Sequence, residues 1–274
     1  MKFNVIETIK KRYSVRSYDS RKVADTLRKD IIDYANALEN PFGGHIKCKF
    51  IDKNTSTKGE KLGTYGMIKN ANLYMGVSIE KEEGHLEALG YEFEELVLYM
   101  TSLGLGTCWL GGTFNKGAFS EIMNISENEV FPIVTPVGYA STLTLKDKVI
   151  RTSLKADKRK DWSVLFFDND FNTPLSKDIE KEYKEALEML RLAPSATNQQ
   201  PWRVVYEDGI FHFFEYKTLP STEVDMQRID VGIAICHFDL TLKEKGVYGQ
   251  FLKIDVSHIQ REKNVIYVTS YIHK

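Results

Sequence analysis

The stretch Arg191-Leu-Ala-Pro-Ser-Ala-Thr-Asn-Gln-Gln-Pro-Trp202 joins a helix-like segment to a strand-like segment. Before it, apolar residues recur at helical spacing over residues 179–190, and after it comes the apolar run 204–206. Pro194 and Pro201 restrict the backbone on both sides, so we expect a defined loop between them. Five neutral hydrogen-bonding side chains occupy this loop and would suit a flat heterocycle. An ordinary helix-to-strand turn remains the alternative, because turns are made of the same residue types.

A second notable segment, Arg12-Tyr-Ser-Val-Arg-Ser-Tyr18, follows a short helix-like pattern at the N-terminus. Two guanidinium groups that flank a hydroxyl can hold a phosphate through charge-assisted hydrogen bonds. A solvated basic face is the alternative interpretation of the same cluster.

Together the two segments resemble motifs of the FMN-dependent nitroreductase family. Residues 193–202 are similar to its Pro-Ser-x-x-Asn-x-Gln-Pro-Trp loop, and residues 12–18 are similar to its opening Arg-x-Ser-x-Arg-x-aromatic motif. Tyr13 stands where a second basic residue is common in the family, which puts the phosphate affinity in question. The resemblance implies an FMN site whose phosphate is held by charge and whose ring system lies against the loop.

Length and composition favour small-molecule chemistry. The 274 residues can bury a substantial core. Lys and Arg number 37 and Asp and Glu number 38, so no overall field favours nucleic acid or a membrane surface as a partner. Three widely spaced cysteines give no disulfide framework, and no apolar run reaches transmembrane length. We therefore expect a cytoplasmic protein, with Cys108 as a small buried hydrophobe rather than a nucleophile.

The order of periodic segments predicts an α+β fold. Helices are expected at 19–40, capped by Asp19 or Ser20, at 89–103, at 116–125, before Arg191, and from Ile229 towards Gly246. Strands are expected at 46–51, 71–79, 133–139, 203–206, 211–216 and 265–272, with a hairpin at Asp208-Gly209. Glu92, Glu94 and Glu95 are expected to match the dipole at the start of the 89–103 helix.

The second part of the chain repeats the first in outline. Gly90 and Gly104 stand 14 residues apart (104 − 90), as do Gly232 and Gly246 (246 − 232), with an apolar helical pattern between each pair. We predict two pseudo-symmetric halves, residues 1–168 and 169–274, each with a small, mostly antiparallel sheet flanked by helices and packed as one unit. Since the family typically forms homodimers with composite sites, the resemblance implies a single chain that imitates the dimer and keeps one FMN site.

The resemblance also assigns the site residues. Phosphate contacts are expected from Arg12, Ser14, Lys148 and Arg151, and Arg16 is expected near the pyrimidine edge of the ring. Pro194, Ser195 and Asn198 are expected to contact the ring and the ribityl chain. Gly111 and Gly112, in the glycine-rich run 104–112, would let the backbone approach the flat ring closely.

The implied function is that of an FMN-dependent NAD(P)H oxidoreductase of the nitroreductase type. It would use NADH or NADPH as donor and reduce nitroaromatics, quinones or similar acceptors by ping-pong transfer, with no side chain acting as acid or base. A reductive dehalogenase-like activity, or a flavin carrier or scaffold without turnover, are the alternatives. The six histidines show no metal-ligand spacing, and His237 on an apolar helix is expected to be a hydrogen-bonded core residue. No Gly-x-Gly-x-x-Gly or P-loop motif occurs.

Overall fold

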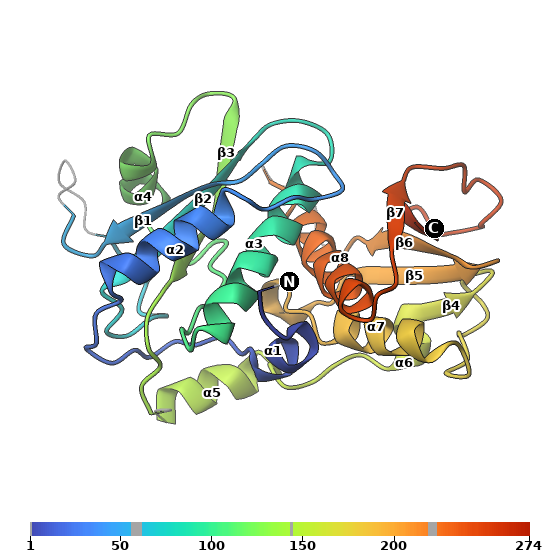
Figure 1. Cartoon of the computed structure of the whole chain (residues 1–274), viewed down its shortest axis with the longest axis horizontal. Coiled ribbons are helices and arrows are strands. Elements are labelled where there is room, and N and C mark those ends of the chain that lie inside the picture. Colours follow the sequence, from blue (N-terminus) through green and yellow to red (C-terminus); the bar gives the residue numbers. More distant parts are fainter. Residues whose placement is uncertain (1, 56–61, 143–144, 219–223) are drawn as a thin grey trace.

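The computed structural model describes residues 2–55, 62–142, 145–218 and 224–274, and for residues 145–148 only the backbone is described. Two separate sheets stand at opposite ends of the molecule, with a pair of long helices between them (Figure 1). The mixed α+β class expected from the sequence is confirmed.

The first sheet has the order β1-β2-β3 and is antiparallel throughout. Its strands are β1 (Lys47–Asp52), β2 (Leu73–Glu80) and β3 (Glu129–Pro136). The helices of this half are α1 (Val5–Lys11), α2 (Asp25–Ala35), α3 (His85–Ser102), α4 (Lys116–Met123) and α5 (Leu145–Ser153). Strand β2 is buried on both faces over most of its length, which explains why its sequence, Leu-Tyr-Met-Gly-Val-Ser-Ile-Glu, is mostly apolar.

The second sheet has the order β4-β5-β6-β8-β7. Its strands are β4 (Phe166–Asp168), β5 (Trp202–Glu207), β6 (Ile210–Tyr216), β7 (Gly249–Leu252) and β8 (Val265–His273). Strand β4 pairs in parallel with β5, and the other pairs are antiparallel. The accompanying helices are α6 (Trp162–Leu165), α7 (Lys181–Arg191) and α8 (Met226–Glu244), and a short 3-10 turn spans Ala196–Asn198.

The central strands of the two sheets share one plan. The order β1-β2-β3 and the order β5-β6-β8 are both antiparallel, and a long helix follows the second strand in each: α3 after β2, and α8 after β6. A single hydrophobic cluster contains buried residues of both halves, from Val5 and Leu96 to Phe238 and Tyr271, so the halves pack as one unit. The boundary at 168/169 and an origin by duplication stay predictions.

Several expected elements differ from the observed ones. Helix α2 begins at Asp25 after the cap residue Ala24, so the cap predicted at Asp19 or Ser20 is wrong. The backbone of residues 17–19 is held in extended form, because Tyr18 pairs with Ala140 and the Asp19 N–H donates to the Tyr139 carbonyl. Helix α5 and strands β4 and β7 were not expected. Strands β4 and β7 have only three and four residues, which is too short to show an alternating pattern.

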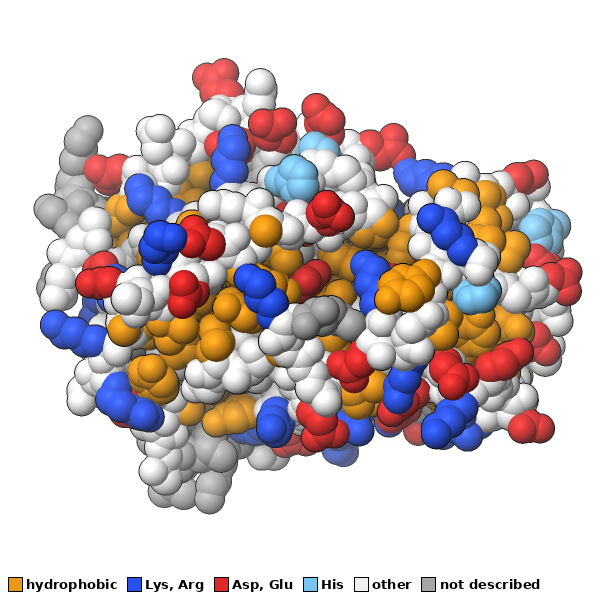
Figure 2. All heavy atoms as spheres, in the orientation of Figure 1, with side chains coloured by type: hydrophobic (Ala, Val, Ile, Leu, Met, Phe, Trp, Pro, Cys, Tyr) orange, Lys and Arg blue, Asp and Glu red, His pale blue; other side chains and the backbone are white. Residues whose placement is uncertain are grey.

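Helix α3 begins at His85 rather than Leu89, so the three glutamates lie in its middle, and their assignment to the helix dipole is wrong. Cys108 is buried, as expected. Among the described residues, no helix has the length and apolarity to cross a bilayer. Figure 2 shows Lys and Arg interspersed with Asp and Glu over the visible face, in keeping with the near-zero net charge.

Candidate functional site

The Arg12–Tyr18 segment lies along the glycine-rich run that follows α3. Arg12 is the C-cap of α1, and its N–H donates to the Thr8 carbonyl at 2.9 Å. Ser14 pairs with Thr107, and the Val15 N–H donates to the Thr107 carbonyl at 2.8 Å. This pairing explains the need for glycine at 106, where a Cβ would lie 2.6 Å from Cγ2 of Val15.

Buried guanidinium groups gather beside this segment. Arg12, Arg16 and Arg159 each have a buried Nε without a hydrogen-bond partner in the part of the chain that the structure describes. Burial, together with the neighbouring charges of Arg12 and Arg191, lowers the pKa of Arg159 to about 10. Burial with like-charged neighbours is costly unless an anion compensates it, so the cluster has the chemistry of an anion site.

The loop after α7 has an unfavourable backbone conformation that is held by hydrogen bonds. Thr197, Asn198 and Gln200 all have positive φ, at 48°, 59° and 49°, which is unfavourable for residues with a Cβ. Ser195 Oγ accepts from the Gln200 N–H at 2.9 Å. The Ala196 N–H donates to both oxygens of Asp230 in α8, at 3.0 and 3.1 Å. The loop is thus anchored to the central helix of its own half.

The segment 155–160 links this loop to the arginines. Arg159 donates through Nη2 to the Leu192 carbonyl at 3.1 Å, directly before the loop. Asn198 donates through Nδ2 to the carbonyls of Lys155 and Lys158 at 2.7 and 3.0 Å. The charge of Arg12 lies close enough to Arg159 to lower its pKa, so the structure brings Arg12 and the loop to one region. In this state the Asn198 amide is occupied by backbone carbonyls.

The remaining predicted site residues differ in their surroundings. Gly112 has open space around its Cα, whereas a Cβ at Gly111 would lie 2.4 Å from Cε of Met226. Arg151, in α5, forms an ion pair with Asp157 and lies 5.6 Å from the centre of the Tyr13 ring. Pro194 is partly exposed at the start of the loop. The side chain of Lys148 lies outside the described residues.

Four residues around the site carry no motif that sequence analysis could have recognised. Arg159 and Asp230 belong to no pattern of the family quoted above. Glu94 is fully buried and accepts from Nε1 of Trp109 at 2.8 Å. His237 is a hydrogen-bonded core residue, as expected, but its partner Glu94 was not foreseen. The available signal was three glutamates in an apolar helix, which indicates a buried polar network if the helix begins early.

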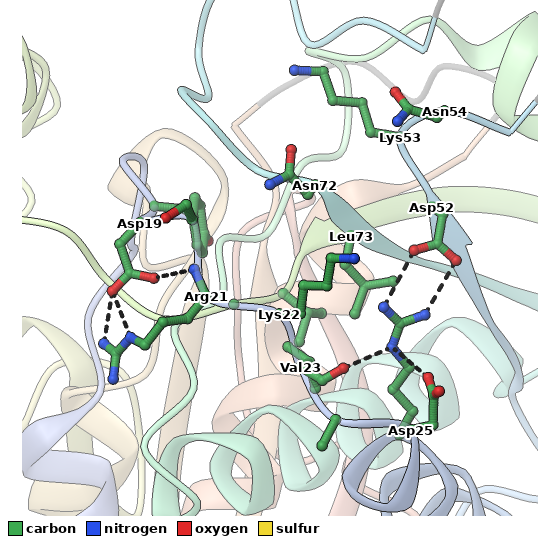
Figure 3. Close-up of a pocket in the computed structure, with 16 residues that line it drawn as sticks. Asp19, Arg21, Lys22, Val23, Asp25, Asp52, Lys53, Asn54, Asn72 and Leu73 are labelled. Carbon is green, nitrogen blue, oxygen red and sulfur yellow. Dashed lines mark hydrogen bonds and ion pairs between the residues drawn. The ribbon is translucent and has the colours of Figure 1, made fainter.

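A separate cavity of about 570 Å³ lies beside residues 18–28, between that segment and the end of β1 (Figure 3). Its charges are mostly paired: Arg21 Nε donates to Asp19 at 2.8 Å, and Arg28 binds both carboxylate oxygens of Asp52 at 3.1 and 3.2 Å. Its lining shares no residue with the predicted cofactor set, so we assign it no role. The described residues contain no group of His, Cys, Asp and Glu that could hold a metal ion.

One solved structure has a similar fold over nearly the whole chain. The chain matches a structure named "putative nitroreductase (tm1586)" from Thermotoga maritima with a TM-score of 0.62 and 22% identity, over 99% of this chain and 94% of that one. An "FMN-dependent Nitroreductase" from Clostridium difficile R20291 matches 51% of this chain and 89% of its own, at 19% identity and a TM-score of 0.40.

A protein from Parabacteroides distasonis, named "Putative NADH dehydrogenase/NAD(P)H nitroreductase", covers 51% of this chain and 89% of its own, at 20% identity and a TM-score of 0.41. No curated protein matches the chain. The model of the family described as "Putative TM nitroreductase" matches residues 4–242, which is most of the sequence. The chain therefore belongs to the nitroreductase family.

Proposed function

We propose that this nitroreductase-family protein is an FMN-dependent NAD(P)H oxidoreductase that reduces nitroaromatics, quinones or similar acceptors by a ping-pong reaction. The observation that carries the proposal is the cluster of Arg12, Arg16 and Arg159, each of which has a buried Nε–H with no hydrogen-bond acceptor among the described residues. These groups lie next to a loop that resembles the flavin-binding loop of the family. The names of two matched structures, which mention FMN and NAD(P)H, support the same choice of cofactors.

The residues of the chain fit the phosphate end of FMN. The orphaned Nε–H groups of Arg12 and Arg159 are donors without acceptors among the described residues, and a phosphate dianion supplies acceptors in several directions. Arg12 and Ser14 would hold this phosphate, together with Arg151 and Lys148 from α5. For Arg151 this requires exchange of the Asp157 carboxylate for the phosphate.

Arg16 would act at the other end of the site. Arg16 is partly buried and its Nε is inaccessible to solvent, so its charge is less screened by water than that of an exposed arginine. A cation placed there lowers the cost of negative charge on a reduced ring. Pro194, Ser195 and Asn198 would line the ring and ribityl chain, and Gly111 and Gly112 would allow close backbone approach.

When bound, FMN would supply the redox chemistry, taking electrons from NADH or NADPH and passing them to the acceptor. The chain's own residues would bind, orient and set the charge of the site, and no side chain is needed as acid or base. We further propose that one chain works alone in the cytoplasm on small molecules.

Anaerobic mixing of the purified protein with FMN and NADH tests the proposal. Prompt bleaching of the flavin absorbance, followed by recovery when a quinone or nitroaromatic is added, is the expected result. Bound flavin that neither NADH nor NADPH bleaches would support a carrier without turnover instead. Absence of flavin binding would reject both functions. A halogenated aromatic tested in parallel would identify a reductive dehalogenase-like member.

A further inference from the structure

A buried histidine and a buried glutamate lie under the arginine site. His237 in α8 and Glu94 in α3 are both completely inaccessible to solvent, and His237 Nε2 lies 3.0 Å from Glu94 Oε1. The other ring nitrogen, Nδ1, lies 2.9 Å from the Met189 carbonyl oxygen in α7. Both nitrogens of this imidazole therefore face oxygen atoms.

These contacts fix how many protons the pair must hold. A backbone carbonyl only accepts, so the Met189 contact requires a proton on Nδ1. The contact between Nε2 and the carboxyl oxygen then requires a second proton, carried either by the imidazole or by the carboxyl group. In the first case an imidazolium faces a carboxylate, and in the second a neutral ring faces a carboxylic acid. The net charge of the pair is zero in both.

Arg12 contacts the same carboxyl group. Its Nε lies 3.5 Å from Glu94 Oε1, and its side chain is only 7% exposed. A neutral imidazole beside an ionised Glu94 would leave a negative charge that cancels the charge of Arg12. With the extra proton, Glu94 still holds the guanidinium in position, but the charge of Arg12 stays available to an anionic ligand.

We propose that His237 and Glu94 are positioning residues that share one buried proton, hold Arg12 in place and preserve its positive charge for the phosphate of the cofactor. This inference rests on the proposed function for the identity of the ligand, but the shared proton itself is independent of any ligand. Because His237 also binds the Met189 carbonyl, the pair connects Arg12 to the helix that leads into the 193–201 loop.

The shared proton is tested by NMR on the flavin-free wild-type protein at near-neutral pH. The nitrogen shifts of His237 and the carboxyl carbon shift of Glu94 are assigned by their loss in the His237→Gln and Glu94→Gln variants. The expected result is one proton in the pair, seen either as a doubly protonated imidazole or as a protonated Glu94. A singly protonated imidazole beside an ionised Glu94 would overturn the proposal.

The effect on charge is tested by FMN affinity. In His237→Gln the amide offers Glu94 a hydrogen bond but no charge, so the carboxylate should partly cancel Arg12 and weaken FMN binding roughly tenfold or more. In the double variant Glu94→Gln/His237→Gln no charge is left beside Arg12, and affinity should return to within about threefold of wild type. A merely structural role predicts that the second substitution makes binding worse.

His212→Gln is the matched control, because His212 is an equally buried imidazole in β6 of the second sheet. Its FMN affinity should equal that of the wild type, and thermal unfolding should show that each variant is folded. Wild-type affinity in His237→Gln, or no recovery in the double variant, would contradict the proposal. If wild-type protein bound no FMN, the proposed function would fail, while the NMR result would still decide whether the pair shares a proton.

Discussion

Gly90 in α3 and Gly232 in α8 face each other's helix through reciprocal backbone contacts. A Cβ at Gly90 would lie 2.1 Å from the Ile229 carbonyl oxygen, and a Cβ at Gly232 would lie 2.2 Å from the Glu87 carbonyl oxygen. Ile229 stands three residues before Gly232, and Glu87 stands three residues before Gly90. Each glycine therefore lies against the residue three positions before the other glycine. Such reciprocity is expected of a two-fold interface and is consistent with the predicted pseudo-symmetric halves, whose duplication stays a prediction.

Substitution at this crossing should destabilise the whole fold. In Gly90→Ala or Gly232→Ala, the new methyl group meets a backbone carbonyl that cannot rotate away, so the helices must separate. We expect each variant to lose about 2 kcal/mol or more of unfolding free energy, although alanine is the better helix former. Denaturant unfolding followed by circular dichroism measures the loss.

Gly112→Ala is the control for this effect, since no heavy atom lies within 4 Å of a Cβ at that position. Its stability should stay within about 0.5 kcal/mol of the wild type. Unchanged stability of Gly90→Ala would mean that the helices do not approach as closely as described.

Part of the crossing between α3 and α8 could be predicted from the sequence. The equal 14-residue spacing of the glycines was visible in the sequence, and it marks two helices that end alike. Gly104 and Gly246 have φ of 80° and 77°, and the following N–H groups of Leu105 and Val247 donate to the Met100 and Leu242 carbonyls at 3.0 and 2.9 Å. Local patterns of this kind predict helices and their ends. They did not predict β4, which is held by pairing to the distant strand β5, or β7, which has only four residues.

Some residues of the candidate site could be predicted from the sequence and others could not. Arg12, Arg16 and the 193–201 loop stand in motifs and could be identified from the sequence. Arg159, Asp230 and Glu94 could not, because they join the site only through contacts between segments far apart in the chain. Glu94 was misjudged because α3 begins four residues earlier than its apolar pattern indicates.

Removal of either N-terminal arginine should release the flavin. Arg12→Ala and Arg16→Ala each delete a positive charge and a buried Nε–H that has no acceptor among the described residues, so each removes a donor that is available to the bound flavin. We expect at least tenfold weaker FMN binding, measured as flavin absorbance retained after desalting at moderate salt. Arg21→Ala serves as control, because Arg21 is exposed and paired with Asp19. Full flavin occupancy in both site variants would show that the phosphate lies elsewhere.

Asp230 should make the stability of the protein dependent on pH. Burial raises the pKa of its carboxyl group well above the usual 3.8, and the Ala196 N–H only partly offsets this. Above 3.8 the native state therefore binds more protons at this group than the unfolded state, so stability falls as pH rises. Asparagine keeps an oxygen for Ala196 and removes the ionisation. Asp230→Asn should gain unfolding free energy relative to wild type as pH rises from 4 towards neutrality. Parallel stability curves for the two proteins would refute this role for the carboxyl group.

The chain should bind one FMN and do so as a monomer. In the first half, the loop corresponding to 193–201 is held by Glu92, which accepts from the Ile46 N–H at 2.9 Å, much as Asp230 holds Ala196. That loop lacks the Ser, Asn and Gln set, and its Phe42 packs against the rings of Tyr91 and Phe251, with centres 6.4 and 6.2 Å away. Apolar side chains therefore pack against the first-half loop, so we expect no mirror-image FMN site there. Titration with FMN, combined with light scattering, should give one flavin per chain of 31.5 kDa. Two flavins per chain would require the first-half loop to open, and one flavin per two chains would place the site between subunits.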